Sequence, residues 1–142
     1  KQTSSFLYSI YTATQVPTVY DQARAAQFEV IREIASKGSC VIVGRAADCV
    51  LRDDPRCVRV FIHAPLAVRV RRATEEYHEV YDNPERALTK KDRSRAAFYN
   101  NFSELPWGDT RNYDLTLNSS IGLDASAEII KAYVEAKFPK CE

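Results

Sequence analysis

The residues best suited to chemistry in this sequence are arginines and lysines that recur in short clusters. Three arginines fall within residues 69–72, and a second basic cluster occupies residues 90–95. A guanidinium presents a planar fork of N–H donors that matches phosphate oxygens, so such clusters are typical of sites that bind phosphate esters. The alternative for each cluster is a solvated helix face, with Glu75 and Glu76 as acidic partners of the first one.

Spacing places members of both clusters on common helix faces. Arg69 and Arg72 are three residues apart, so they share a face, where two guanidiniums repel each other unless an anion lies between them. Asp92 and Arg95 have the same spacing. A carboxylate beside an arginine on a helical flap is suited to hold a ribose and a phosphate at once.

Two further candidate pairs follow predicted strands. Arg45 comes directly after Gly44, and a glycine at a strand end lets a ligand approach the backbone closely. Asp48 is placed to orient that guanidinium or to meet a polar base or sugar edge, although a surface salt bridge is the alternative. Asn118 and Ser119 end another strand, where their polar groups are suited to contact an adenine.

The elements that must position these residues alternate between helices and strands. Apolar periodicity and the Gly and Pro positions predict, in chain order, a helix over 17–37, a strand over 40–44, a short helix over 46–51, a strand over 58–63, helices over 65–81 and 84–102, a strand over 113–118, and a last helix capped by Asp124 with Ile129, Ile130, Tyr133 and Val134 facing the core. This order predicts an α/β fold, a parallel sheet with helices on both faces. Ligands of such sheets bind at the carboxyl ends of the strands.

Composition bounds the class of protein. The chain has 142 residues and a net charge of +1, which predicts one domain over residues 1–142 with a helical, lid-like region over 66–112. No global field draws it to nucleic acid or a membrane, and without aromatic residues between basic ones an RNA-binding module is disfavoured. Its four cysteines form no CxxC pair, and no secretory signal or membrane span is visible. A cytoplasmic location is therefore expected.

Taken in order, these segments resemble the cytidylate kinase-like family. The resemblance covers about residues 17–137, and the runs that carry it are Gly38–Asp48, Val58–Pro65, the Arg69 and Arg72 pair, Asp92–Ala96 and Tyr113–Ser120. Arg45 and the Asp92–Arg95 pair match the family pattern. Ala46 stands where bacterial cytidylate kinase carries an aspartate, and Leu88 lies about where it has a further lid arginine.

The resemblance implies phosphoryl transfer from ATP to a nucleoside monophosphate, with CMP as the expected acceptor, Mg²⁺ as cofactor and a P-loop NTP hydrolase-like fold. The roles that it implies are acceptor binding by Arg45, Asp48, Asp92 and Arg95, closure over the phosphates by Arg69, Arg72 and Lys91, and contact with adenine by Asn118 and Ser119. In such a site fixed guanidiniums stabilise the negative charge of the transition state.

The family's P-loop precedes the region that starts at Lys1, and the sequence contains no GxxxxGK[ST]. The chain also lacks methionine, so we expect a fragment without useful kinase activity of its own. A partner chain, a swapped segment or an amino-terminal piece is then expected to complete the sheet. The alternative is a nucleotide-binding or regulatory module without catalysis.

Overall fold

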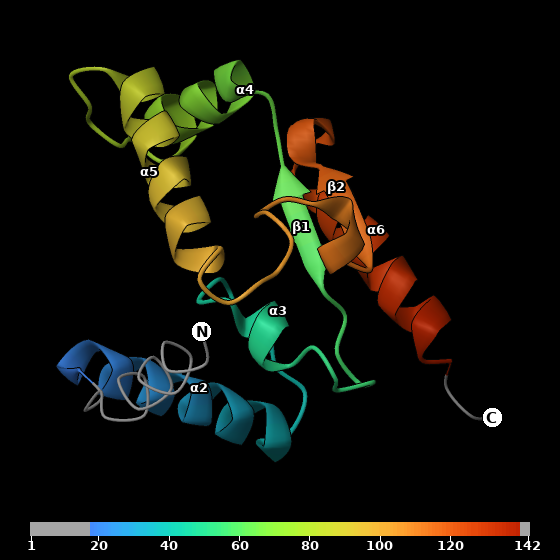
Figure 1. Cartoon of the computed structure of the whole chain (residues 1–142). Helices are drawn as coiled ribbons and strands as arrows, with labels where there is room; N and C mark the ends of the chain where they lie inside the picture. Colours follow the sequence, from blue (N-terminus) through green and yellow to red (C-terminus); the bar gives the residue numbers. More distant parts are fainter. Residues whose placement is uncertain (1–17, 140–142) are drawn as a thin grey trace, which may run out of the picture. The chain divides into compact units, whose positions relative to one another are not determined.

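The computed structural model describes residues 18–139, which fall into two compact units that meet in sequence between Ile42 and Val43. The described part of the first unit is helix α2 (Val19–Lys37) and the segment that follows it. The second unit holds all the other elements, and each unit is considered by itself (Figure 1). Within the described residues, no helix combines the length and apolar character that crossing a bilayer requires.

Helix α2 begins where its sequence provides a cap. The Thr18 hydroxyl accepts the Asp21 backbone N–H at 3.1 Å, and the Asp21 carboxylate accepts the Thr18 backbone N–H at 3.1 Å. This reciprocal capping box satisfies two N–H groups that the first turn of a helix leaves unpaired. The helix ends before Gly38, whose φ of 151° lies in a region that side chains disfavour. The prediction of a helix over 17–37 is confirmed for Val19–Lys37, and Pro17 lies outside the described residues.

The second unit is built on two parallel strands, β1 (Val60–His63) and β2 (Leu115–Asn118), with Val60 opposite Leu115 and His63 opposite Asn118. This confirms the predicted α/β class and two of the predicted strands. The carboxyl ends of the two strands therefore lie side by side, at His63 and Asn118.

An ion pair just before the strands fixes their register. The backbone N–H of Arg59 donates to the Asp114 carboxylate at 2.8 Å, and its guanidinium donates to the same carboxylate at 3.1 and 3.3 Å. The Asp114 backbone N–H donates to the Arg59 carbonyl at 2.8 Å. The guanidinium of Arg59 holds the pKa of Asp114 at about 2. Lys137, near the end of the last helix, lies 3.5 Å from the same carboxylate.

An aromatic cluster packs against β1. The Phe61 ring meets the Trp107 ring edge to face at 5.4 Å between centroids, and it lies 5.0 Å from the Tyr113 ring. Gly108 passes so close that a Cβ there would lie 3.2 Å from the Phe61 ring, and its φ is +84°. Only glycine meets both conditions without strain, so Gly108 lets the loop lie against the strand.

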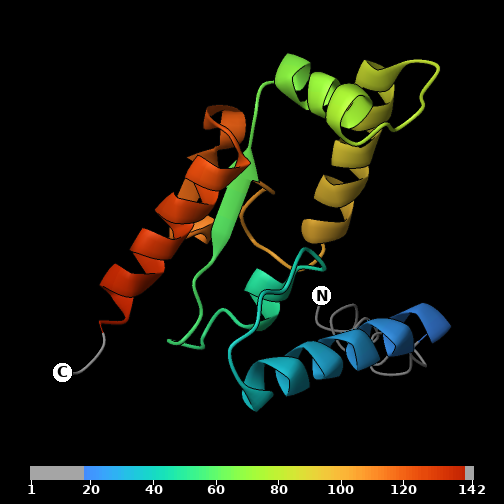
Figure 2. The same cartoon turned by 180° about the vertical axis from the view of Figure 1, so that it is seen from behind.

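A helical pair follows β1. Helix α4 (Leu66–Arg71) continues into a π-helical turn, η1 (Arg72–Glu76), and a loop leads to α5 (Pro84–Tyr99). Pro84 occupies the first turn of α5, and the Asn83 side chain caps it by accepting the Arg86 N–H at 2.8 Å. Helices α4 and α5 lie side by side beyond the carboxyl end of β1 in both views (Figures 1 and 2).

Helix α6 (Leu123–Lys137) runs alongside the sheet (Figure 2). Its predicted core face is only partly correct. Ile130 and Tyr133 are half-buried, but Ile129 and Val134 are exposed. A sheet of two strands is narrower than the apolar stripe of the helix, so no described residue covers the outer members of the stripe. Asp124 is not the cap: it lies in the first turn, and Gly122 holds the N-cap position.

The predicted strand over 40–44 is wrong. This segment has no regular structure, and its residues Val41 and Val43 are 92% and 86% exposed. A strand needs a neighbour that pairs with its backbone, and the described residues pair only β1 with β2. The remaining short elements are α3 (Ala47–Val50), η2 (Thr110–Asn112) and η3 (Ser119–Ile121).

Replacing Asp114 tests the ion pair that fixes the register. We expect Asp114→Asn to lower the free energy of unfolding at neutral pH by about 1–2 kcal/mol, because Arg59 loses a charged, part-buried partner. The pKa of Asp114 is lowered from 3.8 to about 2. Its contribution to the free energy of unfolding is therefore complete at pH values above 3.8 and is lost as the pH falls toward 2. The variant should lack this part of the acid dependence.

Urea unfolding of both proteins at several pH values between 2 and 7 measures the difference. Glu135→Gln, an exposed carboxylate on α6, is the matched control and should change little. Equal stability and equal acid dependence of Asp114→Asn and the parent chain would show that this pair does not hold the strands.

Candidate functional site

A basic hollow of about 240 Å³ lies between α4, η1 and α5. Its lining residues are Arg69, Arg72, Ala73, Tyr77, Glu79, Leu88, Lys91 and Arg95. Four of them are cations that the sequence singled out, and they come from two helices separated by a loop. The fold thus brings together basic side chains that are distant along the chain.

The Asp92 carboxylate lies between two of these cations. Arg69 of α4 donates to both of its oxygens, at 2.7 and 2.9 Å, and Arg95 donates from one turn along α5 at 2.9 Å. The first contact is a fork-to-fork pair across two helices, which is the strong form of this interaction. The Asp92 side chain is 25% exposed and that of Arg95 is 56% exposed, so the outer guanidinium remains open to solvent.

Arg72 is held at the ends of the two strands. It is the first residue of η1, and its guanidinium donates to the Ser119 hydroxyl at 3.2 Å and to the Ser119 carbonyl at 3.1 Å. The Ser119 hydroxyl in turn donates to the His63 carbonyl at 3.2 Å. The Nε of Arg72 lies 3.6 Å from the Glu76 carboxylate. This nitrogen is buried and has no hydrogen-bond partner in the described part of the chain.

Lys91 lines the far side of the hollow. Its ammonium donates to Glu79 at 3.1 Å and to the Tyr81 hydroxyl, and it lies 5.0 Å from the centre of the Tyr81 ring. Glu79 and Tyr81 belong to the loop between η1 and α5. These contacts attach that loop to α5, which gives the hollow its outer wall.

Arg45 and Asp48 do not line this hollow. Gly44, Arg45 and Ala46 all have positive φ, at 72°, 57° and 53°, and Ala46 is buried. For a residue with a side chain this conformation is uncommon and costs free energy, so packing must hold it.

Asp48 instead contacts the end of α5. One of its oxygens accepts the Tyr99 hydroxyl at 2.6 Å. Burial and this hydrogen bond to Asp48 raise the pKa of Tyr99. Burial likewise raises the pKa of Tyr113, whose ring stacks on that of Tyr99 at 6.5 Å between centroids. Asp48 therefore connects α3 with the end of α5.

Asn118 and Ser119 occupy the strand end that the sequence predicted. The Asn118 side chain accepts the Ser120 N–H at 3.0 Å and so caps η3. Ser119 is buried and bonded to Arg72. Its place explains why a small hydroxyl residue is suited to this position, because it must accept from a guanidinium and donate to a carbonyl at once.

Several residues of the site carried no signal in the sequence. Glu79, Tyr77 and Tyr81 lie in an irregular segment with no periodicity, and their pairing with α5 depends on how the loop folds back. Glu76 fits the sequence expectation of an acidic partner on this helix, since it lies near Arg72. The bond between Ser119 and Arg72 joins residues 47 positions apart, and no local pattern reveals it.

The charge balance of the hollow defines its chemistry. Four cations are in contact with three carboxylates, Asp92, Glu76 and Glu79, so positive charge remains in excess. Such a site can bind an anion with several oxygens, because guanidiniums from α4 and α5 approach it from different directions. Among residues 18–139, no group of three His, Cys, Asp or Glu side chains is placed to hold a metal ion.

Comparisons with known proteins found a matching family model and similar solved structures. A family model described as the cytidylate kinase-like family matches residues 1–121. The crystal structure of an uncharacterized protein from Eubacterium ventriosum ATCC 27560 is similar, with a TM-score of 0.75 and 28% sequence identity over 84% of this chain and 68% of that chain. The search of curated proteins found no match.

A double-mutant cycle tests which arginine is bound more strongly by Asp92. We expect a coupling free energy of about 1–2 kcal/mol between Arg69 and Asp92, because the pair is bidentate and three-quarters buried. The coupling between Arg95 and Asp92 should stay below about 0.5 kcal/mol, since an exposed pair within one helix gains little. Gln and Asn replacements, singly and paired, followed by urea unfolding, measure both. Equal couplings would mean that the bridge between α4 and α5 is not the stronger contact.

Proposed function

The chain belongs to the cytidylate kinase-like family, and on that premise we propose that its basic hollow binds the phosphate groups of nucleotides during phosphoryl transfer from ATP to a nucleoside monophosphate. CMP is the acceptor that we propose, because the family model is described as cytidylate kinase-like. The observation that supports this proposal most is the convergence of Arg69, Arg72 and Arg95 on one hollow.

The three guanidiniums have different tasks in this proposal. Arg72 is fixed by Ser119 and lies at the carboxyl ends of the strands, where ligands of parallel sheets bind. It would provide a preorganised positive charge that needs no rearrangement during the reaction. Arg69 and Arg95 share Asp92, so their charges are only partly neutralised and they can turn toward a phosphate.

Phosphoryl transfer demands this kind of site. The transition state spreads negative charge over the oxygens of the transferred group, and positioning together with charge stabilisation supplies most of the catalysis. Lys91, which Glu79 holds at the edge of the hollow, would add a fourth cation. Helices α4 and α5 would exclude water from the closed site.

The acceptor's base and sugar would lie toward Arg45, Asp48 and Asp92. Asp48 uses one oxygen to accept from Tyr99, and within residues 18–139 no hydrogen bond reaches its other oxygen, so that oxygen can accept from an amino or hydroxyl group. Asn118 and Ser119 would border the adenine of ATP. The described residues offer no carboxylate cluster for Mg²⁺, which would travel with the ATP phosphates.

The fold that this proposal requires is P-loop NTP hydrolase-like. Two parallel strands would then be part of a wider sheet, completed by further residues of the same gene product or by a second copy of the chain. The 142 residues contain no GxxxxGK[ST], and a second copy of the chain has the same sequence, so the loop that cradles the donor phosphates would have to come from further residues of the gene product. A nucleotide-binding module without catalysis is the second candidate, favoured by the same absence.

Binding of CMP and of cytidine by the 142-residue chain tests the phosphate site. We expect CMP to bind at least about tenfold more tightly, because charge-assisted hydrogen bonds to the phosphate contribute about 1.5–3 kcal/mol. Arg72→Gln and Arg95→Gln should each remove most of this difference. Isothermal titration calorimetry measures it, with the exposed Arg52→Gln as the charge-matched control. Equal affinities for CMP and cytidine would contradict the proposal.

Transfer itself is tested with ATP and the acceptors CMP, UMP and AMP. The 142-residue chain should give no product, whereas the gene product that supplies a P-loop should phosphorylate one acceptor. In that protein Arg72→Gln should lower kcat by roughly 10²–10³-fold, by analogy with the loss of one preorganised donor. Phosphate-dependent binding without transfer by any form would leave the non-catalytic module as the function.

A further inference from the structure

The outer face of α5 carries a second set of cations. Arg86, Lys90 and Arg93 are spaced by four and three residues, so at about 100° per residue they lie on one side of the helix. Asp92 and Arg95, which belong to the basic hollow, lie on the opposite side by the same geometry. The same helix thus presents positive charge to two separate places.

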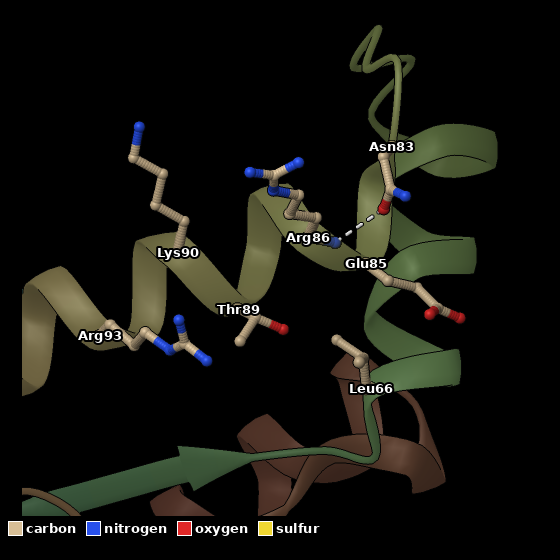
Figure 3. A pocket seen from close by; sticks show the side chains of 7 residues that line it. All are labelled: Leu66, Asn83, Glu85, Arg86, Thr89, Lys90 and Arg93. Carbon is tan, nitrogen blue, oxygen red and sulfur yellow. Dashed lines mark hydrogen bonds between the residues drawn. The ribbon is translucent and has the colours of Figure 1, made fainter.

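A hollow of about 620 Å³ lies over this outer face. Its lining residues are Leu66, Asn83, Glu85, Arg86, Thr89, Lys90 and Arg93. Figure 3 shows Arg86 and Lys90 extending side by side from α5, while Thr89 and Arg93 lie on the side nearer Leu66. Leu66 belongs to the first turn of α4, so the hollow spans the beginnings of both helices.

The outer cations lack the partners that the inner ones have. Lys91 pairs with Glu79 and Arg95 pairs with Asp92, but among residues 18–139 the side chains of Arg86, Lys90 and Arg93 have no ion-pair partner. Like charges four residues apart on a helix destabilise it. A bound anion would relieve that repulsion. Binding of an anion therefore gives a reason for three cations to lie on one face of the helix.

We propose that this outer hollow binds a short anion of two or three linked phosphates, at a site separate from the basic hollow. The ligand is either free polyphosphate or the phosphate chain of a nucleotide. Arg86, Lys90 and Arg93 neutralise its charge, and the Thr89 hydroxyl donates a further hydrogen bond. This site goes beyond the proposed transfer reaction, which uses the opposite face of α5.

The dimensions of the cationic face favour a short ligand. Arg86 and Arg93 are seven residues apart, which is about 10 Å along the helix. The Glu85 carboxylate borders one end, turned away from the Arg86 guanidinium, and would repel a polyanion that continued past it (Figure 3). None of the seven lining residues is aromatic, so the hollow offers no platform for stacking the bases of a nucleic acid.

The test uses the 142-residue chain with the basic hollow disabled by Arg72→Gln and Arg95→Gln. In that background, calorimetric titration with pyrophosphate should show binding that weakens at least about tenfold in the further variant Arg86→Gln/Lys90→Gln/Arg93→Gln, because three charge-assisted contacts are removed. The control variant instead replaces three exposed cations outside the outer hollow with Gln, so that it loses the same amount of positive charge. These residues are Arg32, Arg52 and Lys131. It should bind pyrophosphate as the parent does.

The other outcomes either overturn the proposal or identify the source of the ligand. Pyrophosphate binding that survives the outer triple variant, or that the control variant loses equally, shows that no specific site exists. Tighter binding of a ten-nucleotide RNA than of pyrophosphate, lost in the outer variant, would make this face a nucleic-acid surface instead. Adenosine triphosphate binding far more tightly than inorganic triphosphate identifies a nucleotide as the source. Equal affinities for adenosine triphosphate and inorganic triphosphate identify free polyphosphate as the source. If the triple variant unfolds, the single variant Arg93→Gln repeats the test.

Discussion

Repulsion among like charges is the constraint on which this structure depends. Four cations line a hollow of about 240 Å³, and they can stay there because carboxylates are placed between them. Asp92 separates Arg69 from Arg95, Glu76 lies near Arg72, and Glu79 holds Lys91. Because cations exceed carboxylates, an anion from solution would complete the charge balance. This excess of positive charge is the basis of the phosphate site that we propose.

The sheet gives this charge cluster a fixed point. The Arg59–Asp114 pair sets the register of β1 and β2, so His63 and Ser119 lie together where the strands end. Ser119 donates to the His63 carbonyl and accepts from Arg72, which attaches the first residue of η1 to both strands. Helix α4 and its continuation η1 are thus anchored to the sheet at one guanidinium, and Lys91 holds the loop with Glu79 against α5.

The sequence predicted those parts of the molecule whose causes are local. The end of α2 before Gly38, the Asn83–Pro84 boundary of α5 and the i,i+3 pairing of Asp92 with Arg95 all follow from neighbours in the chain. The prediction of a strand over 40–44 was wrong because an apolar run forms a strand only where another strand pairs with its backbone. The bonds of Arg69 to Asp92 and of Arg72 to Ser119 depend on how the helices fold back, which no spacing reveals.

The central claim is that a nucleotide phosphate lies among the guanidiniums of the basic hollow. The most direct measurement follows the Nε–Hε NMR signals of Arg69, Arg72 and Arg95 while the chain is titrated with CMP or with cytidine. The account predicts that CMP shifts all three signals and that cytidine leaves them unchanged. The Arg72 signal should shift although its Nε is buried. Signals that stay in place with CMP, or that move equally with cytidine, would contradict it.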